Sequence, residues 1–446
     1  GSPDNDFLVY WPVYDTWYNI KGKPFYAFTI GQTLNEWLVP TSFYRTASKL
    51  HEKGYGFDYI SDHFLADAKV ENGRVKTQGA SYKVLVVPSC RLMPVETMRK
   101  IISLINEGAK VAFVDNFAQD VPGLHNFDAR RQQLISLVLS FPEHSFVNMG
   151  KVTKMGKGTL ITGSNIDKLV DLCGVKRETV VDDGIQYIRR SNPEGFHYFF
   201  ANLQSKALDG WVTLGVDAVS AQIFDPLTGK TGLAGLRKKK KETEVYLQLK
   251  PGQSLILKTY SSKKLKGEYW NYIETAGTPV ELEGKWSFSF KGGQPKIQGK
   301  FEMNELKSWT ELNTPEAKNF AGTGRYILKF NLPETKAADW LLDLGKVCES
   351  ARVLLNGQKV DTLWSLPFQA QVGKYLKPGE NILQVDVTNL PANRIADYDR
   401  KGIQWRIFYE INFVNSAYKP FDASGWDSMP SGLLGPVKLI PIKSKF

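Results

Sequence analysis

The chain has 446 residues, of which 42% are hydrophobic and 23% are charged, as is ordinary for globular protein. No run of about 18 apolar residues occurs, so the sequence predicts no membrane-spanning segment. Its three cysteines, Cys90, Cys173 and Cys348, have the spacing of neither a disulfide framework nor a zinc site, and we expect no cofactor and no metal. The length favours about three domains, each with its own core.

The first part of the chain alternates strand and helix patterns. Apolar runs predict strands at Phe7–Tyr10, Lys83–Pro88 and Lys110–Val114. Helical spacing predicts helices at Asn35–Glu52, Pro94–Asn106, Asn126–Leu139 and Asn165–Leu172. Strands that are apolar throughout and alternate with helices predict a parallel sheet covered on both faces, here assigned to residues 1–177.

Helical periods end near residue 178, and short strands separated by turn residues follow. They are predicted at Ile185–Arg190, His197–Asn202, Gly210–Leu214, Ala221–Phe224, Glu244–Leu249 and Ser254–Lys258. Their spacing predicts a small all-β domain over residues 178–262. A linker rich in Ser and Lys, residues 261–266, then leads to an all-β domain over residues 263–446.

The last domain has the clearest strand and turn signals. Ala351–Leu355 alternates apolar and polar residues, and Asn356-Gly357 supplies the two positive-φ residues of a type I′ turn before a return strand at Gln358–Leu363. After a Pro-Gly corner, another alternating strand runs over Asn381–Val387. This order of strands and tight turns is typical of an antiparallel sandwich.

A block of five basic residues, Arg237–Lys241, supplies much of the excess of 57 Lys and Arg over 46 Asp and Glu. We interpret it as a solvated loop between two strands; contact with a polyanion, such as an acidic polysaccharide, is the alternative. The sequence contains no recognisable nucleic-acid-binding module, so we expect no nucleic-acid partner.

The sequence gives only weak indications of a catalytic site. Cys90 follows an apolar strand, the place where amidotransferase-like enzymes carry a nucleophile, but the glycines and the His-x-Glu arrangement of such a site are missing. We therefore expect a non-catalytic thiol. No catalytic residue is predicted elsewhere.

Aromatic residues give a more suggestive signal. The segment 10–19 carries five aromatics in the ten residues that begin at the end of the first strand, where α/β sheets build sites. Aromatic faces stack on sugar rings while polar side chains bind hydroxyls. A second aromatic group, formed by Trp405, Tyr409 and Trp426, occurs near charged residues of the last domain. The predicted carbohydrate-binding residues are Tyr14, Asp15, Trp17, Asn19, Asp397, Asp399, Arg400 and Trp405. The alternatives are an interface with a neighbouring domain for the first group and a structural role for the second.

Several segments resemble the C-terminal part of family 106 glycoside hydrolases, the α-L-rhamnosidases. They are Tyr10–Trp17, Gly56–Asp62, Asp343–Ile395 and Ser431–Val437. The Asp343–Ile395 stretch is also similar to the sugar-binding jelly roll of large glycoside hydrolases.

The resemblance implies an amidotransferase-like parallel-sheet domain, a small β-sandwich and a galactose-binding-like jelly-roll β-sandwich. It further implies that a catalytic barrel precedes them, that the substrate is a plant cell-wall glycan such as an acidic pectin, and that the protein is periplasmic or secreted. No catalytic residue of the family has a counterpart in these positions. Gly1-Ser2 is typical of a cloning remnant, so we expect the barrel and any leader to lie upstream of this chain.

Three functions stay open at this point. The leading one is an accessory region that supports the barrel and contributes to a substrate subsite, inactive alone. The second is a free-standing carbohydrate-binding protein. The third is a glycosidase with a site between the first and last domains, which would require two carboxyl groups about 5–10 Å apart.

Overall fold

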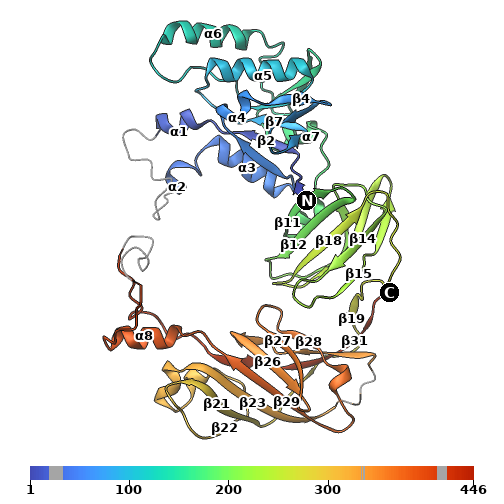
Figure 1. Cartoon of the computed structure of the whole chain (residues 1–446), viewed down its shortest axis with the longest axis vertical. Coiled ribbons are helices and arrows are strands. Elements are labelled where there is room, and N and C mark those ends of the chain that lie inside the picture. The colour runs from blue at the N-terminus through green and yellow to red at the C-terminus, as the bar shows by residue number, and fades with distance from the viewer. Residues whose placement is uncertain (20–33, 333, 335–336, 409–418) are drawn as a thin grey trace. The chain divides into compact units, whose positions relative to one another are not determined.

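The computed structural model describes residues 1–19, 34–332, 334, 337–408 and 419–446 (Figure 1). The chain divides into two compact units. Unit 1 comprises Gly1–Gln204, Leu208–Leu249 and Ser254–Trp270; unit 2 comprises Ser205–Ala207, Lys250–Gln253 and Asn271–Phe446. The fold is a mostly β, multidomain one. The predicted boundaries after residues 177 and 262 both lie inside unit 1, and the division into three domains stays a prediction.

The N-terminal part of unit 1 is built on a sheet with the strand order β3-β2-β7-β8-β10-β9. Its strands are β2 (Phe7–Tyr10), β3 (Phe57–Ile60), β7 (Val84–Val87), β8 (Lys110–Val114), β9 (Lys151–Met155) and β10 (Gly158–Gly163). Neighbours are parallel except for β9, which pairs antiparallel with β10. In chain order the parallel strands read 2-1-3-4-5, the arrangement of a doubly wound sheet. The predicted parallel sheet is confirmed.

Helices cover both faces of this sheet (Figure 1). The helices of this part of the chain are α1 (Val13–Asn19), α2 (Leu34–Trp37), α3 (Ser42–Glu52), α4 (Asp62–Ala66), α5 (Val95–Glu107), α6 (Phe127–Leu139), which packs on α5, and α7 (Ile166–Leu172). Alternate strand residues point to opposite faces. Leu8 and Leu85 therefore join a core with Ile101 of α5, whereas Val9 and Val86 join another with Leu50 of α3 and Val170 of α7. A small sheet of β4 (Lys69–Glu71), β5 (Arg74–Lys76) and β6 (Ser81–Tyr82) lies between α4 and β7 in the chain.

The helix predicted over Asn35–Glu52 is two helices, α2 and α3. Pro40 separates them, because proline lacks an N–H and disfavours helical backbone in the residue before it. Thr41 then caps α3, and its Oγ1 accepts a hydrogen bond from the Tyr44 N–H at 3.1 Å. The prediction of one continuous helix was therefore wrong at this point.

The rest of unit 1 is antiparallel β. One sheet has the order β1-β11-β12-β18-β14-β15, and a smaller one has the order β13-β17-β16. The strands are β1 (Ser2–Pro3), β11 (Ile185–Asn192), β12 (Gly195–Asn202), β13 (Leu208–Leu214), β14 (Ser220–Phe224), β15 (Thr231–Leu233), β16 (Leu236–Lys239), β17 (Glu242–Leu249) and β18 (Ser254–Tyr260). The short 3₁₀ helix η1 (Thr179–Asp183) precedes β11. Six of these strands match the six predicted ones, with ends that differ by a few residues.

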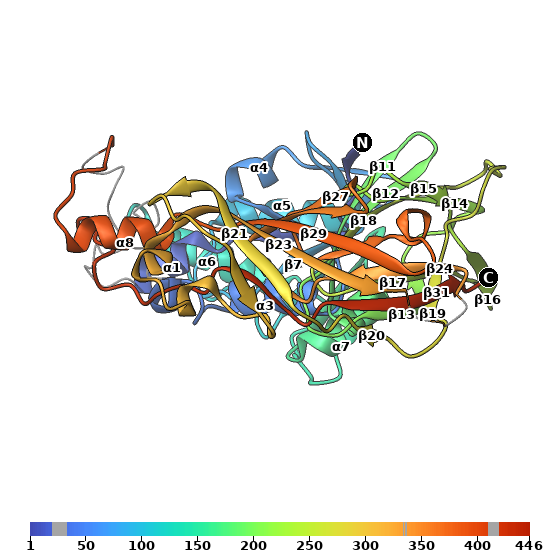
Figure 2. The same ribbon diagram turned by 90° about the horizontal axis from the view of Figure 1, so that it is seen from below.

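Unit 2 packs two antiparallel sheets around one core. The first has the order β22-β21-β23-β29-β26-β27, whose central strands run side by side in Figure 2, and the second contains β19, β31, β24, β28 and β20. Phe288, Tyr326 and Val385 of the first sheet and Trp340 and Leu439 of the second share the core. The architecture is that of an antiparallel sandwich, as predicted.

The elements of unit 2 are as follows. Its strands are β19 (Ile273–Thr275), β20 (Val280–Glu281), β21 (Trp286–Gln294), β22 (Phe301–Met303), β23 (Ala321–Asn331), β24 (Asp339–Asp343), β25 (Lys346–Cys348), β26 (Ser350–Leu355), β27 (Gln358–Leu363), β28 (Gln369–Gln371), β29 (Glu380–Thr388), β30 (Gly432–Gly435) and β31 (Lys438–Ser444). Its helices are η2 (Trp309–Glu311), η3 (Pro315–Asn319), η4 (Gly373–Tyr375) and α8 (Ala392–Arg400). The predicted turn between β26 and β27 is confirmed, since Asn356 and Gly357 have φ of 52° and 79°.

The basic block is mostly strand rather than loop, so its interpretation as a solvated loop was wrong. Arg237, Lys238 and Lys239 belong to β16, whose ladder with β17 orders them. Arg237 lies 4.2 Å from the centre of the Trp211 ring, and its Nε is 2.5 Å from the buried Glu244 carboxylate. Lys239 also pairs with Glu244 at 3.3 Å, and Lys238 pairs with Asp217 at 3.1 Å. Three of the five basic side chains thus share two carboxylate partners, and the block keeps a net positive charge.

Candidate functional site

The carboxyl ends of β2 and β7 form the switch point of the doubly wound sheet, where ligands of such folds usually bind. In this chain α1 begins there. The Asp15 carboxylate of α1 accepts hydrogen bonds from the backbone N–H groups of Arg91 and Leu92, each at 2.7 Å. Burial raises the pKa of Asp15, while these two donors oppose the shift. Asp15 therefore fastens α1 to the loop after β7.

Cys90 lies in that same loop and is buried. Burial raises the pKa of the Cys90 thiol well above its usual value, and the nearby Asp15 and Asp62 carboxylates raise it further. A thiol in these surroundings stays protonated at neutral pH and is a poor nucleophile. That Cys90 is not catalytic stays a prediction.

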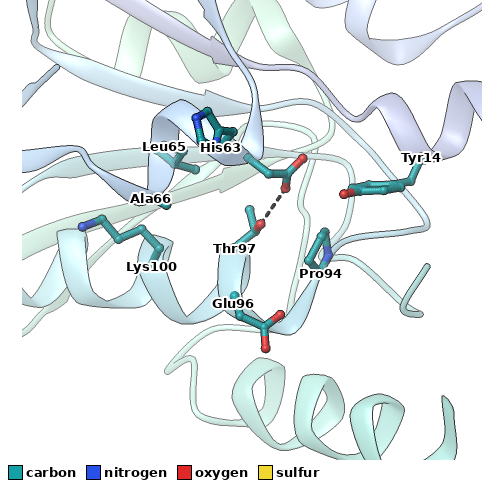
Figure 3. Close-up of a pocket in the computed structure, with 9 residues that line it drawn as sticks. Tyr14, His63, Leu65, Ala66, Pro94, Glu96, Thr97 and Lys100 are labelled. Carbon is teal, nitrogen blue, oxygen red and sulfur yellow. Dashed lines mark hydrogen bonds between the residues drawn. The ribbon is translucent and has the colours of Figure 1, made fainter. Parts of the chain in front are cut away.

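Beside α1, a cavity of about 230 Å³ opens between α1, α4 and the start of α5 (Figure 3). Its central polar group is the Asp62 carboxylate. Asp62 Oδ1 accepts one hydrogen bond from the Tyr10 hydroxyl at 2.9 Å and another from the Thr97 hydroxyl at 2.5 Å. Tyr10 and Thr97 are both buried, so the carboxylate is held in one orientation.

Other side chains complete the lining. The cavity is lined by Tyr14, Asp62, His63, Leu65, Ala66, Pro94, Glu96, Thr97 and Lys100. Figure 3 shows the hydroxyl of Tyr14 pointing into the space between α1 and α5. Burial, and then the Asp62 charge, raises the pKa of Tyr14, so its hydroxyl is protonated at neutral pH and can donate a hydrogen bond. The site thus combines one fixed acceptor with a Tyr donor and an apolar wall.

The structure places the four predicted residues of unit 1 on α1 but gives them different surroundings. Tyr14 lines the cavity and packs edge-on against Trp17, with ring centroids 5.6 Å apart. Trp17 is 57% exposed and Asn19 is exposed, so both can meet a ligand from solvent. Both carboxylate oxygens of Asp15 instead accept hydrogen bonds from backbone N–H groups. Their binding role stays a prediction.

The predicted residues of unit 2 gather at α8 and the loop that follows it. Asp399 accepts hydrogen bonds from the Trp405 Nε1 at 2.7 Å, from Arg406 at 3.0 Å and from the Ala423 N–H at 2.9 Å. Asp397 accepts from Asn319 at 2.9 Å and pairs with Lys401 at 2.8 Å. Both side chains are 7% exposed, and Asp399 holds the loop after α8 through its three partners.

Arg400 points elsewhere, since its guanidinium donates to the Ser424 carbonyl at 3.2 Å. The arginine that pairs with Asp399 is Arg406, which the sequence did not single out. Tyr409, from the predicted aromatic group, lies outside the described residues. Binding of sugar by this group also stays a prediction.

The Asp399 contacts predict acid sensitivity. Burial acts to raise the pKa of Asp399, but the Ala423, Trp405 and Arg406 donors outweigh it and lower the pKa below 3.8. A carboxyl whose pKa is lowered on folding adds stability above its unfolded pKa and loses it as the pH falls through the folded pKa. Asp399→Asn should therefore lower the thermal midpoint of unit 2 at pH 7 by about 2–4 °C, corresponding to about 1 kcal/mol.

That difference between wild type and Asp399→Asn should shrink as the pH is lowered from about 4 toward 2. Differential scanning calorimetry across this range measures it. The exposed Asp361→Asn is a suitable control, and an equal difference at pH 7 and at low pH would contradict the assigned role.

Two further findings bear on the site. Among the described residues, no group of three or more His, Cys, Asp or Glu side chains is arranged to hold a metal ion. No helix in the described ranges is long and apolar enough to cross a membrane.

Comparison with known proteins gives a family match over part of the chain. The model of the family described as alpha-L-rhamnosidase, glycoside hydrolase family 106, matches residues 30–237. A protein of Formosa agariphila named "Putative beta-glucuronidase" is 35% identical over 202 residues, which are 41% of this chain and 17% of that protein. A rhamnosidase structure from Novosphingobium sp. PP1Y superposes with a TM-score of 0.66 and 24% identity, covering 87% of this chain and 36% of that one.

This chain thus spans well under half the length of either protein, and the second likeness concerns the fold alone. Of the four segments that suggested the family, Gly56–Asp62 lies within the matched residues 30–237, and the other three lie outside them. The resemblance to family 106 α-L-rhamnosidases is confirmed over residues 30–237, and the chain is a family 106-like, glycoside hydrolase-like protein.

Proposed function

We propose that this chain is an accessory region of an α-L-rhamnosidase-like glycoside hydrolase that acts on plant cell-wall glycans in the periplasm or outside the cell. Its roles are to support a catalytic domain carried upstream in the longer protein and to contact the glycan. The chain alone is inactive in this proposal. Residues 1–177 are an amidotransferase-like domain without catalysis, residues 178–262 a small β-sandwich, and residues 263–446 a galactose-binding-like jelly roll.

The observation that carries the supporting role is an apolar row on the open face of a sheet in unit 1. Ile188 of β11 pairs in register with Phe199 of β12, Phe199 with Ile256 of β18, and Ile256 with Phe224 of β14. Ile188 is 61% exposed and Phe199 is 41% exposed. An antiparallel sheet that faces water normally carries polar residues there, and contiguous exposed apolar surface is typical of an interface.

The fold likeness supports a further domain of the same protein as the partner of this apolar row. The rhamnosidase structure from Novosphingobium matches most of this chain with only 36% of its own length, so most of that chain has no counterpart here. A further domain of the same protein is the partner that we propose for the row. The doubly wound strand order, 2-1-3-4-5, supports the amidotransferase-like assignment of the first domain.

The test is hydrolysis of a chromogenic α-L-rhamnoside by this 446-residue chain and by the same chain joined to the upstream region of the longer protein. We expect activity in the extended protein alone. Activity of the shorter chain would overturn the proposal and place a catalytic site within its own residues.

A second test concerns the apolar row. A variant that carries both Ile188→Ser and Phe199→Ser should bind the separately produced upstream region more weakly than the unchanged chain does, whereas Gln186→Ser, on the same face, should bind it equally well.

A further inference from the structure

Two Asn-Gly pairs form the same kind of turn in this chain but have different surroundings. Asn72-Gly73 joins β4 to β5, and Asn356-Gly357 joins β26 to β27. The φ angles are 51° and 72° in the first pair and 52° and 79° in the second, so the two backbones are closely alike. A difference in the chemical behaviour of the two asparagines therefore comes from what surrounds each turn.

The Asn356 side chain is held at both of its polar atoms. Its Nδ2 donates to the Tyr375 carbonyl at 2.9 Å and to Asn381 Oδ1 at 2.8 Å. Its Oδ1 accepts from the Ile382 N–H at 2.9 Å, and the Asn356 backbone N–H donates to the Ile382 carbonyl at 2.9 Å. The side-chain bonds must open before the carboxamide can turn toward the backbone nitrogen of Gly357.

The Asn72 side chain has no such restraint. In the described part of the chain it makes no hydrogen bond, and both Asn72 and Gly73 are exposed. The strands that this turn joins, Lys69–Glu71 and Arg74–Lys76, have three residues each, whereas β26 and β27 have six. Fewer backbone hydrogen bonds therefore hold the β4–β5 turn, and its tip opens more readily than that of the β26–β27 turn.

This freedom has a chemical consequence for an asparagine that precedes glycine. The backbone nitrogen of Gly73 can attack Cγ of the Asn72 carboxamide, because glycine has no Cβ to hinder the approach. A C–N bond forms, and the carboxamide nitrogen leaves as ammonia with the proton of the Gly73 N–H. Water then opens the cyclic succinimide at either carbonyl, which yields aspartate or isoaspartate. The reaction thus exchanges ammonia for water and needs no oxidant or reductant.

We propose that Asn72 is a modification site at which this protein spontaneously forms aspartate and isoaspartate, whereas Asn356 is protected. The product places a new negative charge in the β4–β5 turn, and isoaspartate also lengthens its backbone. The turn lies beside the end of α5, since a Cβ at Gly73 would be 3.7 Å from the Gly108 carbonyl oxygen. Because the carbonyls at a helix C-terminus repel negative charge, the modified turn packs less closely on α5. The proposal does not depend on a carbohydrate role.

The experiment is peptide mapping of the purified chain after incubation in mildly alkaline buffer, in which a backbone nitrogen is more readily deprotonated. Trypsin releases the two turns as short peptides, residues 70–74 and 353–359, and mass spectrometry measures the exchange of amide for acid in each. We expect Asn72 to react at least about tenfold faster than Asn356, because several hydrogen bonds restrain Asn356. Equal rates, or faster reaction at Asn356, would overturn the proposal.

The unfolded chain is the matched control. In guanidinium chloride neither asparagine has a fixed partner, so the two rates should converge. If the native difference persisted there unchanged, it would arise from the neighbouring residues in the sequence and not from the fold, and the protection assigned to the Asn356 contacts would be wrong.

Gly73→Ala tests the attacking nitrogen. The added methyl group hinders the approach and should slow the reaction at Asn72, while the Gly108 oxygen is the nearest atom that it meets. A thermal unfolding midpoint shows whether the variant folds, and an unchanged rate in the folded variant would contradict attack by this nitrogen.

Asn72→Asp supplies the new charge without lengthening the backbone. Hydrogen exchange over residues 69–76 should be faster in this variant than in the fresh protein, and faster still in the aged protein that contains isoaspartate. Residues 350–363, which contain the protected turn, are the internal control and should exchange equally in all three samples. Unchanged exchange over residues 69–76 after ageing would overturn the predicted loosening.

Discussion

Arg189→Met should lower the free energy of unfolding of unit 1 by about 3–5 kcal/mol, since removing the arginine of a buried ion cluster leaves Glu178 without a cation while Asp6 keeps only Lys83. The Arg189 side chain is only 6% exposed and contacts three carboxylates. Its nitrogens lie 2.5 Å from Asp4, 2.9 Å from Asp6 and 2.7 Å from Glu178. Because Asp6 immediately precedes β2 and Arg189 lies on β11, the cluster ties the parallel sheet to the antiparallel one.

Methionine keeps most of the volume of the arginine stem, so the variant isolates the charge. Glu178 retains the Tyr198 hydroxyl and the Gly215 N–H, both at 2.8 Å, but would face Asp6 without a cation between them. Urea denaturation followed by circular dichroism measures the loss. The neighbouring Arg190→Met is the control, because Arg190 is exposed, and it should stay within about 0.5 kcal/mol of wild type. Equal effects of the two variants would show that the cluster adds no stability.

Gly432→Ala should destabilise unit 2 by about 2–5 kcal/mol, because a methyl group there meets both backbone strain and a filled core. Gly432 has φ of +107°, a value that L residues rarely adopt. An added Cβ would lie 2.2 Å from the Tyr326 hydroxyl oxygen and 2.9 Å from the Trp309 ring. Both side chains are buried in the sandwich, so neither can move aside freely.

Gly357→Ala separates the effect of backbone strain from the effect of close contacts with the core. Gly357 also has a positive φ, +79°, but no atom lies within 4 Å of the Cβ position, so only the strain of about 1–2 kcal/mol applies. Adding Tyr326→Phe to Gly432→Ala removes the oxygen nearest the new methyl group and should restore part of the stability. Thermal unfolding of the four proteins measures these differences. If Gly432→Ala were no worse than Gly357→Ala, the close approach to Tyr326 would not matter.

Local signals in the sequence predict much of the fold. The positive φ of Asn356 and Gly357 follows from the residue types alone. The apolar run of β7 likewise predicts a strand without reference to any other segment. Pro40 also indicated a break in the helix, but the helical spacing of apolar residues on both sides of it led to the prediction of one continuous helix. The strand β16 was not predicted, because five adjacent basic residues are typical of a loop. Their carboxylate partners, Glu244 and Asp217, become neighbours only in the folded chain.

The candidate site is less predictable because its parts are distant in sequence. Tyr10 and Asp62 are 52 positions apart and Asp62 and Thr97 are 35 apart, so no spacing links them. Aromatic density did lead to Tyr14, which lines the cavity. The same signal led to Asp15, whose role in fastening α1 depends on N–H groups 76 and 77 positions away. Residue type suggested polar contacts in both cases, but only the fold decides which partner each finds.

The ion pairs of β16 have a consequence for the behaviour of the protein in concentrated solution. β16 is the last strand in its sheet order, so its outer edge presents backbone N–H and C=O groups that another chain could pair with. Lysines on such an edge must be desolvated before a second strand can dock, and like charges on the incoming copy repel. Lys238 and Lys239 therefore help to keep copies of this chain from joining edge to edge into aggregates.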